Sequence, residues 1–338
     1  MYKWLENTWN ALAQASDTLP HALLLRGPAG IGKQALAEAL AADLLCEQPQ
    51  TDRHACGTCP ACLWLASGNH PDFRCLQPDD GLAAGEEGEA RAKAKDAKPS
   101  VWITVDQVRA LHEFIHVASH RGGRKVIVVS PAESLNPAAA NALLKNLEEP
   151  PSRTHFILIS HRPHRLLRTI LSRCVQRPLA KPRHDDALAW LSAQGVTEPE
   201  IALAQAGGAP LLAQTLAGSD VLAGRRACLR LLADGAFEPL PAAESLADTG
   251  IERFAGWLLR WTSDLVEQRM LGRICYNPDF SSDIKALASR IDTLAALRLQ
   301  RRLLHEQRHV QHPLNARLYV ESLLFAYQAL INPVRRAA

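Results

Sequence analysis

The chain has 338 residues, of which 47% are hydrophobic and 22% charged, so it lacks the low hydrophobicity and high charge of a disordered protein. Its formal net charge of +3 is too small to indicate nucleic-acid binding over the whole surface, so any contact with DNA must be local. The length exceeds that of one ordinary domain and predicts two or three.

The N-terminal residues, Met1 to Glu6, do not form the basic stretch followed by an apolar run that is typical of a secretion signal. The sequence also lacks a run of roughly 18 apolar residues, the length that a membrane-spanning helix needs. We therefore expect a cytoplasmic protein that does not contact a membrane.

Short apolar runs alternate with helical patterns in the first half of the chain. The first run, His21–Arg26, is followed by glycines and then by Ala and Leu at helical spacing from Gln34 to Leu45, which predicts a strand, a loop and a helix. Further strands are expected at Val101–Val105, Lys125–Val129 and His155–Ser160. Because strands and helices alternate, the sequence predicts an α/β domain with a parallel sheet.

The second half of the chain is helical in pattern. After Pro178 the strand signals fade, and Leu and Ala recur at helical spacing to the end. We expect the α/β domain to span residues 1–178, a small helical lid to span 179–220 and an all-α bundle to span 221–338. Within the first domain, the Gly-, Ala-, Glu- and Lys-rich stretch at about 79–99 predicts a mobile, solvated insertion.

A phosphate-binding motif follows the first expected strand. The run Gly27-Pro-Ala-Gly30-Ile-Gly32-Lys33 matches G-x-x-x-x-G-K in the required place, between a strand and a helix. Backbone N–H groups of such a loop bind phosphates, and Lys33 would reach the outer ones. The next position holds a Ser or Thr that binds Mg²⁺ in an ATPase, but here it is Gln34.

The acidic pair of an ATPase is missing as well. An Asp for the metal and a Glu for the attacking water belong at the end of the strand Lys125–Val129, where this chain has Ser130 and Pro131. Glu133 follows two residues later and is expected to point elsewhere. The sequence therefore predicts a site that does not hydrolyse ATP, although it leaves residual nucleotide binding open.

Four cysteines lie within 17 positions in the pattern C-x9-C-x2-C-x2-C: Cys46, Cys56, Cys59 and Cys62. Four thiolates at this spacing, with turns at Gly57 and Pro60, predict a closed structural Zn²⁺ site, and an iron–sulfur cluster is the alternative. Cys75, Cys174, Cys228 and Cys275 have no partners at ligand spacing. We interpret Cys75, Cys228 and Cys275 as small buried hydrophobic residues.

Two further motifs make the likeness to a known family specific. The run from Asn141 to Pro151, NALLKNLEEPP, followed by Ser172-Arg173-Cys174, resembles the clamp-loader branch of the AAA+ ATPases. The inserted four-cysteine module narrows the resemblance to the bacterial DNA polymerase III clamp-loader subunits, and the incomplete phosphate loop makes the chain similar to their delta-prime group. The likeness covers roughly residues 1 to 220.

The resemblance implies a function for Arg173. It would be an arginine finger, inserted in trans against the γ-phosphate of ATP in a neighbouring motor subunit, and the alternative is a structural ion-pair arginine. The family further implies a structural Zn²⁺, no intrinsic activity, and membership of a holoenzyme with DNA-directed DNA polymerase activity. The implied partners are the tau/gamma and delta subunits of a hetero-pentamer, the sliding clamp and primer–template DNA, with residues 221–338 in the oligomeric collar.

Some other positions depart from the family pattern, and some residues allow more than one function. The nucleotide-sensing arginine of the lid aligns with Pro210, and the sensor of the sheet aligns with Ser160-His161. Basic residues at Arg121, Arg124 and Lys145 could contact DNA phosphates, but solvated surface charge explains them equally well. The alternative functions are an ATP-hydrolysing motor subunit that uses Gln34 and Glu133, and a zinc-containing DNA-binding module.

Overall fold

The computed structural model describes residues 1–78, 100–120, 123–246, 249–306 and 315–332. The chain divides into two compact units, Met1–Arg183 and His184–Ala338. The first unit is α/β and the second is all-α, which confirms the predicted fold class. The insertion expected at 79–99 lies outside the described residues, and the boundary expected at residue 220 stays a prediction.

A five-stranded parallel sheet forms the centre of the first unit, in the order β2-β3-β4-β1-β5. Its strands are β1 (Ala22–Arg26), β2 (Phe73–Leu76), β3 (Lys125–Val129), β4 (Thr154–Ser160) and β5 (Val175–Pro178). The three middle strands consist mostly of Leu, Val and Ile and are almost wholly buried. Continuous apolar strands of this kind are typical of a sheet that is covered on both faces.

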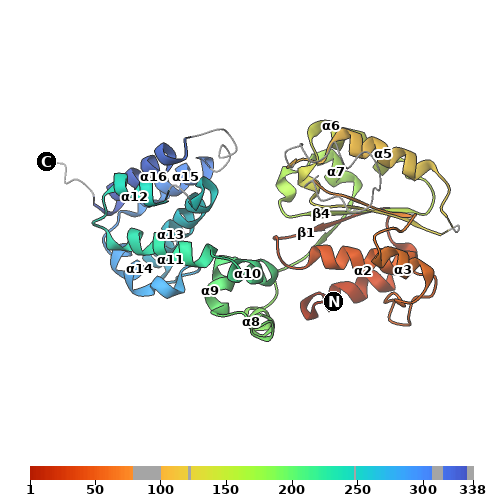
Figure 1. Cartoon of the computed structure of the whole chain (residues 1–338), viewed down its shortest axis with the longest axis horizontal. Helices are drawn as coiled ribbons and strands as arrows, with labels where there is room; N and C mark the ends of the chain where they lie inside the picture. The colour runs from red at the N-terminus through yellow and green to blue at the C-terminus, as the bar shows by residue number, and fades with distance from the viewer. Residues whose placement is uncertain (79–99, 121–122, 247–248, 307–314, 333–338) are drawn as a thin grey trace. The chain divides into compact units, whose positions relative to one another are not determined.

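Helices cover both faces of this sheet (Figure 1). One face carries α1 (Glu6–Gln14), α2 (Lys33–Leu45) and α3 (Pro60–Ala66), and the other carries α5 (Val105–His116), α6 (Pro137–Glu148) and α7 (Arg168–Arg173). Short 3₁₀ turns complete the unit: η1 (Lys3–Leu5), η2 (Ser16–Thr18), η3 (Ala132–Ser134) and η4 (Pro163–Arg165). The result is a three-layer α/β/α arrangement with the phosphate loop between β1 and α2.

The strand expected at Val101–Val105 is wrong. Only Ile103 forms a bridge, to Leu135, and α5 begins at Val105. Thr104 accepts a hydrogen bond from the N–H of Gln107, and the Gln107 side chain accepts one from the N–H of Thr104, so the pair forms a capping box. The strand at this edge of the sheet is instead β2, which has only four residues and two exposed ones, Arg74 and Cys75, at its centre.

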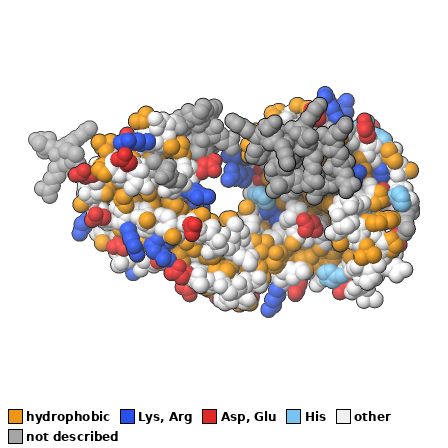
Figure 2. Space-filling view, viewed as in Figure 1, with side chains coloured by type: hydrophobic (Ala, Val, Ile, Leu, Met, Phe, Trp, Pro, Cys, Tyr) orange, Lys and Arg blue, Asp and Glu red, His pale blue; other side chains and the backbone are white. Residues whose placement is uncertain are grey.

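The second unit consists of helices. They are α8 (His184–Ala193), α9 (Pro199–Gln205), α10 (Pro210–Ala217), α11 (Val221–Asp234), α12 (Pro239–Leu246), α13 (Ile251–Leu271), η6 (Pro278–Phe280), α14 (Ser281–Ala288), α15 (Thr293–Glu306) and α16 (Ala316–Ile331). Leu258, Trp261 and Tyr327 lie in the core that α11 to α16 share. On the visible face of this unit, acidic and basic side chains are interspersed (Figure 2). In the described part of the chain, no helix combines the length and apolarity needed to cross a membrane.

A buried polar network ties α9 to the bundle. Gln205 at the end of α9 donates to Asn277 Oδ1 at 3.0 Å, and Arg225 of α11 donates to the same oxygen at 2.8 Å. Arg225 also holds both carboxylate oxygens of Asp279. Asp264 accepts the N–H of Asn277 at 2.7 Å, and burial raises its pKa. This network lies inside the second compact unit and joins residues 184–220 to the bundle.

Candidate functional site

The four predicted metal ligands come together in the first unit. Cys46 follows α2, Cys59 precedes α3, and all four sulfurs lie within 4.8 Å of one another. The Sγ–Sγ distances are 3.9 Å for Cys46–Cys59 and 4.0 Å for Cys56–Cys62. A tetrahedral zinc site with Zn–S bonds of about 2.3 Å requires sulfurs about 3.8 Å apart. The geometry therefore fits a structural zinc ion.

The chemistry of the sulfurs fits a metal as well. Hydrogen bonds from the backbone, that of Thr58 first, lower the pKa of Cys56 to about 6, whereas burial raises the pKa of Cys62 to about 12. A bound Zn²⁺ deprotonates its thiol ligands, so it would allow all four to act as thiolates. Backbone N–H groups of Cys56, Cys59 and Cys62 each lie 3.3–3.4 Å from the sulfur of another cysteine and would stabilise that charge.

The backbone conformation of the phosphate loop requires glycine at three of its positions. Gly30 and Gly32 have φ angles of +74° and +93°, which side chains rarely adopt, and Gly32 is the N-cap of α2. At Gly27, a Cβ atom would lie 2.4 Å from the carbonyl oxygen of Leu179. The motif therefore forms the sharp turn that its sequence predicts.

Lys33 does not extend into open space above this loop. It is 2% exposed, and its Nζ donates to the carbonyl oxygens of Gly27 at 2.7 Å and Pro28 at 2.5 Å. Burial lowers the pKa of Lys33 to about 8, against a smaller opposing effect of the Glu133 charge. The ammonium group that would bind phosphates thus bonds to the loop itself.

The N-terminal turn packs on the outer side of the loop. The indole of Trp4 donates to the carbonyl oxygen of Ile31 at 2.9 Å, and the Tyr2 and Trp4 rings stack with centroids 5.0 Å apart. A Cβ atom at Gly32 would lie 2.7 Å from the Tyr2 ring and 3.0 Å from Leu5. The motif gives no sign of this contact, and the aromatic residues at the N-terminus were the available signal.

The two candidate substitutes for ATPase residues bond to other partners. The amide nitrogen of Gln34 donates to Glu38 at 2.8 Å. Glu133 is near enough to Lys33 for its charge to oppose the lowering of the Lys33 pKa, and the expectation that it points elsewhere stays a prediction. One oxygen of Glu133 accepts the N–H groups of His161 and Arg162 at 2.9 and 3.0 Å, which ties η3 to the end of β4.

The sensor positions at the end of β4 are Ser160, which is buried, and His161, which is half-buried. Ser160 is 0% exposed, and burial, followed by the nearby Lys33 charge, lowers the pKa of His161. A lowered pKa makes a positively charged His161 less favourable, which weakens its attraction for a phosphate. The lid position Pro210 is the first residue of α10 and is buried. These residues therefore provide packing and little electrostatic attraction for a nucleotide.

Arg173 lies at the last position of α7, with a side chain 33% exposed. Its Nη1 donates to Thr169 O at 3.0 Å and to Ser172 Oγ at 3.4 Å, and its Nη2 forms an ion pair with Glu148. His21, Leu147, Glu148, Ser172 and Arg173 line a surface hollow of about 460 Å³. The guanidinium group thus borders a concave, solvent-accessible surface, and its contact with Glu148 was not predicted from the sequence.

Arg173 and the phosphate loop lie at opposite ends of β1. Strand β5 runs parallel to β1 with Val175 opposite Leu23, so Arg173, two residues earlier, lies beside the start of β1. The phosphate loop begins at Gly27, after the last residue of that strand. A strand of five residues spans about 16 Å, which a single Arg side chain does not bridge. Arg173 therefore does not serve the loop of its own chain.

In the described part of the chain, the cysteines outside the cluster and the basic residues considered for DNA contact differ in burial from one to the next. Cys228 is buried as expected, but Cys75 and Cys275 are exposed, so their interpretation as buried residues is wrong. Arg124 donates to Ser16 O and forms an ion pair with Asp17, so it is held within the unit. Lys145 is exposed on α6, and Arg121 lies outside the described residues.

The fold and loop define a class: a P-loop α/β protein with a four-cysteine module, followed by a helical unit. The model of the family described as "DNA polymerase III, delta subunit" matches residues 5–183. DNA polymerase III subunit delta' of Pseudomonas aeruginosa is 38% identical over 98% of this chain and 99% of its own length. The subunit delta' of Yersinia pestis is 34% identical over 90% and 88%, and that of Escherichia coli is 37% identical over 60% and 56%.

These matches cover enough of the chain to show the family to which it belongs. The model covers more than half of the chain, and the Pseudomonas aeruginosa relative is similar along almost its whole length. The chain belongs to the delta-prime family of DNA polymerase III subunits.

Proposed function

We propose that this chain is a non-hydrolysing subunit of a replicative clamp loader and supplies Arg173 in trans to ATP bound by a neighbouring motor subunit. The observation that carries the proposal is the separation of Arg173 from its own phosphate loop by the length of β1. A permanently charged, planar guanidinium group at a concave surface is suited to stabilise phosphate charge on another chain.

The state of the phosphate loop supports the absence of hydrolysis. Lys33 bonds to loop carbonyls, and Trp4 and Tyr2 pack against Ile31 and Gly32. The motor-subunit alternative needs Gln34 at a metal ion and Glu133 at a water molecule. Since Gln34 bonds to Glu38 and Glu133 bonds to the backbone after β4, both would have to rearrange. We therefore favour the non-hydrolysing function.

Membership of the delta-prime family gives the expected partners. They are the tau/gamma motor subunits and the delta subunit, in a cytoplasmic hetero-pentamer that loads the sliding clamp on primer–template DNA. The lid at 179–220 and the collar at 221–338 would hold the chain in this ring, and the zinc module at 46–62 would stiffen the sheet unit. The polymerase activity belongs to the holoenzyme as a whole.

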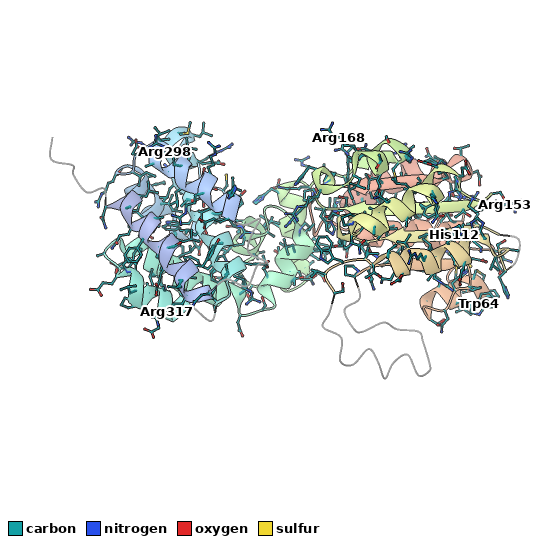
Figure 3. All side chains as sticks on the ribbon, turned by 90° about the horizontal axis from the view of Figure 1, so that it is seen from above. Trp64, His112, Arg153, Arg168, Arg298 and Arg317 are labelled. Atoms are coloured by element: carbon teal, nitrogen blue, oxygen red, sulfur yellow. The ribbon has the colours of Figure 1, made fainter. Side chains whose placement is uncertain are left out.

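The experiment is ATP hydrolysis by a complex reconstituted with Arg173→Ala. At the ATP site that faces this chain, we expect the rate of hydrolysis to fall on the order of 10³-fold. The total DNA-stimulated rate of the complex should therefore fall by at least the share that this site contributes. The control is Arg168→Ala, because Arg168 is an exposed arginine that projects from the other end of α7 (Figure 3). Assembly, followed by size-exclusion chromatography, stays intact in both. An unchanged rate with Arg173→Ala contradicts the proposal.

A further inference from the structure

The contact between Arg173 and Glu148 points to regulation of the proposed finger. We propose that Glu148 is a latch: it holds Arg173 in a resting arrangement from which a phosphate on the neighbouring subunit must displace it. The inference rests on the proposed function of Arg173 and adds a residue that opposes its action. Glu148 is the last residue of α6, Arg173 is the last residue of α7, and these two helices pack against each other.

The hydrogen bonds of the guanidinium group carry the argument. An arginine has five N–H donors, two on each Nη and one on Nε. Both donors of Nη1 are used, by Thr169 O and Ser172 Oγ, and Nη2 is paired with Glu148. The Nε atom is buried and has no hydrogen-bond partner among the described residues. A phosphate that takes the Nη2 N–H now paired with Glu148 must displace that carboxylate, whereas the two bonds of Nη1 can remain.

Charge makes Glu148 the partner whose loss matters most. Its carboxylate neutralises the guanidinium group, so an incoming phosphate meets a pair without net charge. Glu148 and Arg173 side chains are 46% and 33% exposed, and an ion pair in such a position is weak because water screens both groups. Separation of Glu148 from Arg173 therefore costs little free energy. Thr169 O and Ser172 Oγ are neutral acceptors that keep the Arg173 side chain oriented. The surface hollow beside the pair gives a phosphate access to it.

A positioning function for Glu148 makes the opposite prediction. If the carboxylate held Arg173 in its active geometry, removal of the charge would slow hydrolysis in the complex. If it is a latch, removal of the charge frees Arg173 and leaves hydrolysis equal to that of the wild type or faster. The variant Glu148→Gln tests both, because it keeps the size of the side chain and removes only the charge.

The first measurement uses the isolated chain and does not depend on the finger hypothesis. Phenylglyoxal modifies accessible arginines, and mass spectrometry of peptides gives the rate at Arg173, with the exposed Arg168 as an internal reference. We expect Glu148→Gln to raise the Arg173 rate about two- to five-fold, as for the loss of one screened ion pair. Glu149→Gln, an exposed neighbour with the same charge change, should leave it unaltered. Equal Arg173 rates in Glu148→Gln and wild type overturn the latch.

The second measurement is ATP hydrolysis by the reconstituted complex. With Glu148→Gln we expect a rate equal to the wild-type rate or up to about five-fold higher. A fall comparable to that of Arg173→Ala overturns the latch and assigns Glu148 to positioning. If the proposed function of Arg173 is wrong, the complex with Arg173→Ala hydrolyses ATP at the wild-type rate. The labelling rates of the isolated chain still decide in that case whether Glu148 restrains Arg173.

Discussion

The residues at the two ends of strand β1 differ in how accessible they are to another molecule. At the carboxyl end, the phosphate loop is covered by side chains of its own chain: Lys33 bonds to its carbonyls, and Tyr2 and Trp4 pack on its outer side. At the amino end, Arg173 is partly exposed and is held by one screened ion pair and local hydrogen bonds. The loop proposed not to hydrolyse ATP is thus covered by packing, whereas the group proposed to serve a neighbour stays accessible.

This comparison predicts that changes around the phosphate loop alter stability and leave the activity of the complex intact, and that changes at Arg173 do the reverse. In order of decreasing effect, we expect one change at the metal site beyond the far end of α2 and three changes around the phosphate loop to alter stability. In each, ATP hydrolysis by the reconstituted complex should stay at the wild-type level at temperatures where the variant is folded.

The largest effect is expected from loss of the metal at the end of α2. Cys59→Ser should abolish binding of about one zinc ion per chain and lower the free energy of unfolding by several kcal/mol, because structural zinc contributes directly to folding. Elemental analysis and thermal unfolding measure the two effects. The control is Cys75→Ser, an exposed cysteine outside the cluster. A full zinc content in Cys59→Ser would refute the assignment of the ligands.

Gly32→Ala tests the cover over the phosphate loop. Both the φ angle of +93° and the contact with Tyr2 and Leu5 oppose a Cβ atom, so the free energy of unfolding should fall by about 3 kcal/mol. Gly68→Ala is the matched control, because Gly68 has a φ angle of +77° and nothing within 4 Å, and it should lose about 1 kcal/mol. Urea unfolding gives both values. Equal losses would mean that the N-terminal turn does not press on the loop.

Glu133→Ala removes the carboxylate that joins η3 to the end of β4. Two backbone N–H groups, those of His161 and Arg162, lose their acceptor, so we expect a loss of about 2 kcal/mol in urea unfolding. If Glu133 instead activated water in this chain, the isolated protein would hydrolyse ATP and the variant would not. Unchanged stability together with lost hydrolysis would reverse our account of this residue.

The pH dependence of stability tests the burial of Lys33. Its pKa is about 8 in the folded protein and 10.5 ordinarily, so between these values the unfolded chain binds more protons than the folded one. The contribution of Lys33 to the free energy of unfolding should therefore rise with pH, by about 1 kcal/mol from pH 8 to 9.3. The difference between wild type and Lys33→Met isolates this contribution from the other titrating groups. A difference independent of pH would contradict the burial.

The sequence was sufficient for the features that depend on residue type at fixed spacing. The glycines of the loop, the four cysteines and the missing Ser, Asp and Glu of the ATPase site could all be read directly. It was not sufficient where long-range contacts decide. Val101–Val105 has strand-forming residues, but the capping box of Thr104 and Gln107 starts a helix there. The contacts of Glu133, Glu148 and Trp4 join residues that are 25 to 29 positions apart, and no local sequence pattern predicts such pairs.

The most direct test of the central claim compares Lys33→Met and Arg173→Ala in the same reconstituted clamp loader, with DNA-stimulated ATP hydrolysis as the readout. In an ordinary motor subunit the loop lysine binds the outer phosphates of ATP, and its loss should stop turnover. We predict the wild-type rate for Lys33→Met and a strongly reduced rate for Arg173→Ala. A reduced rate for Lys33→Met with a normal rate for Arg173→Ala would show that this chain hydrolyses ATP itself and gives no finger to a neighbour.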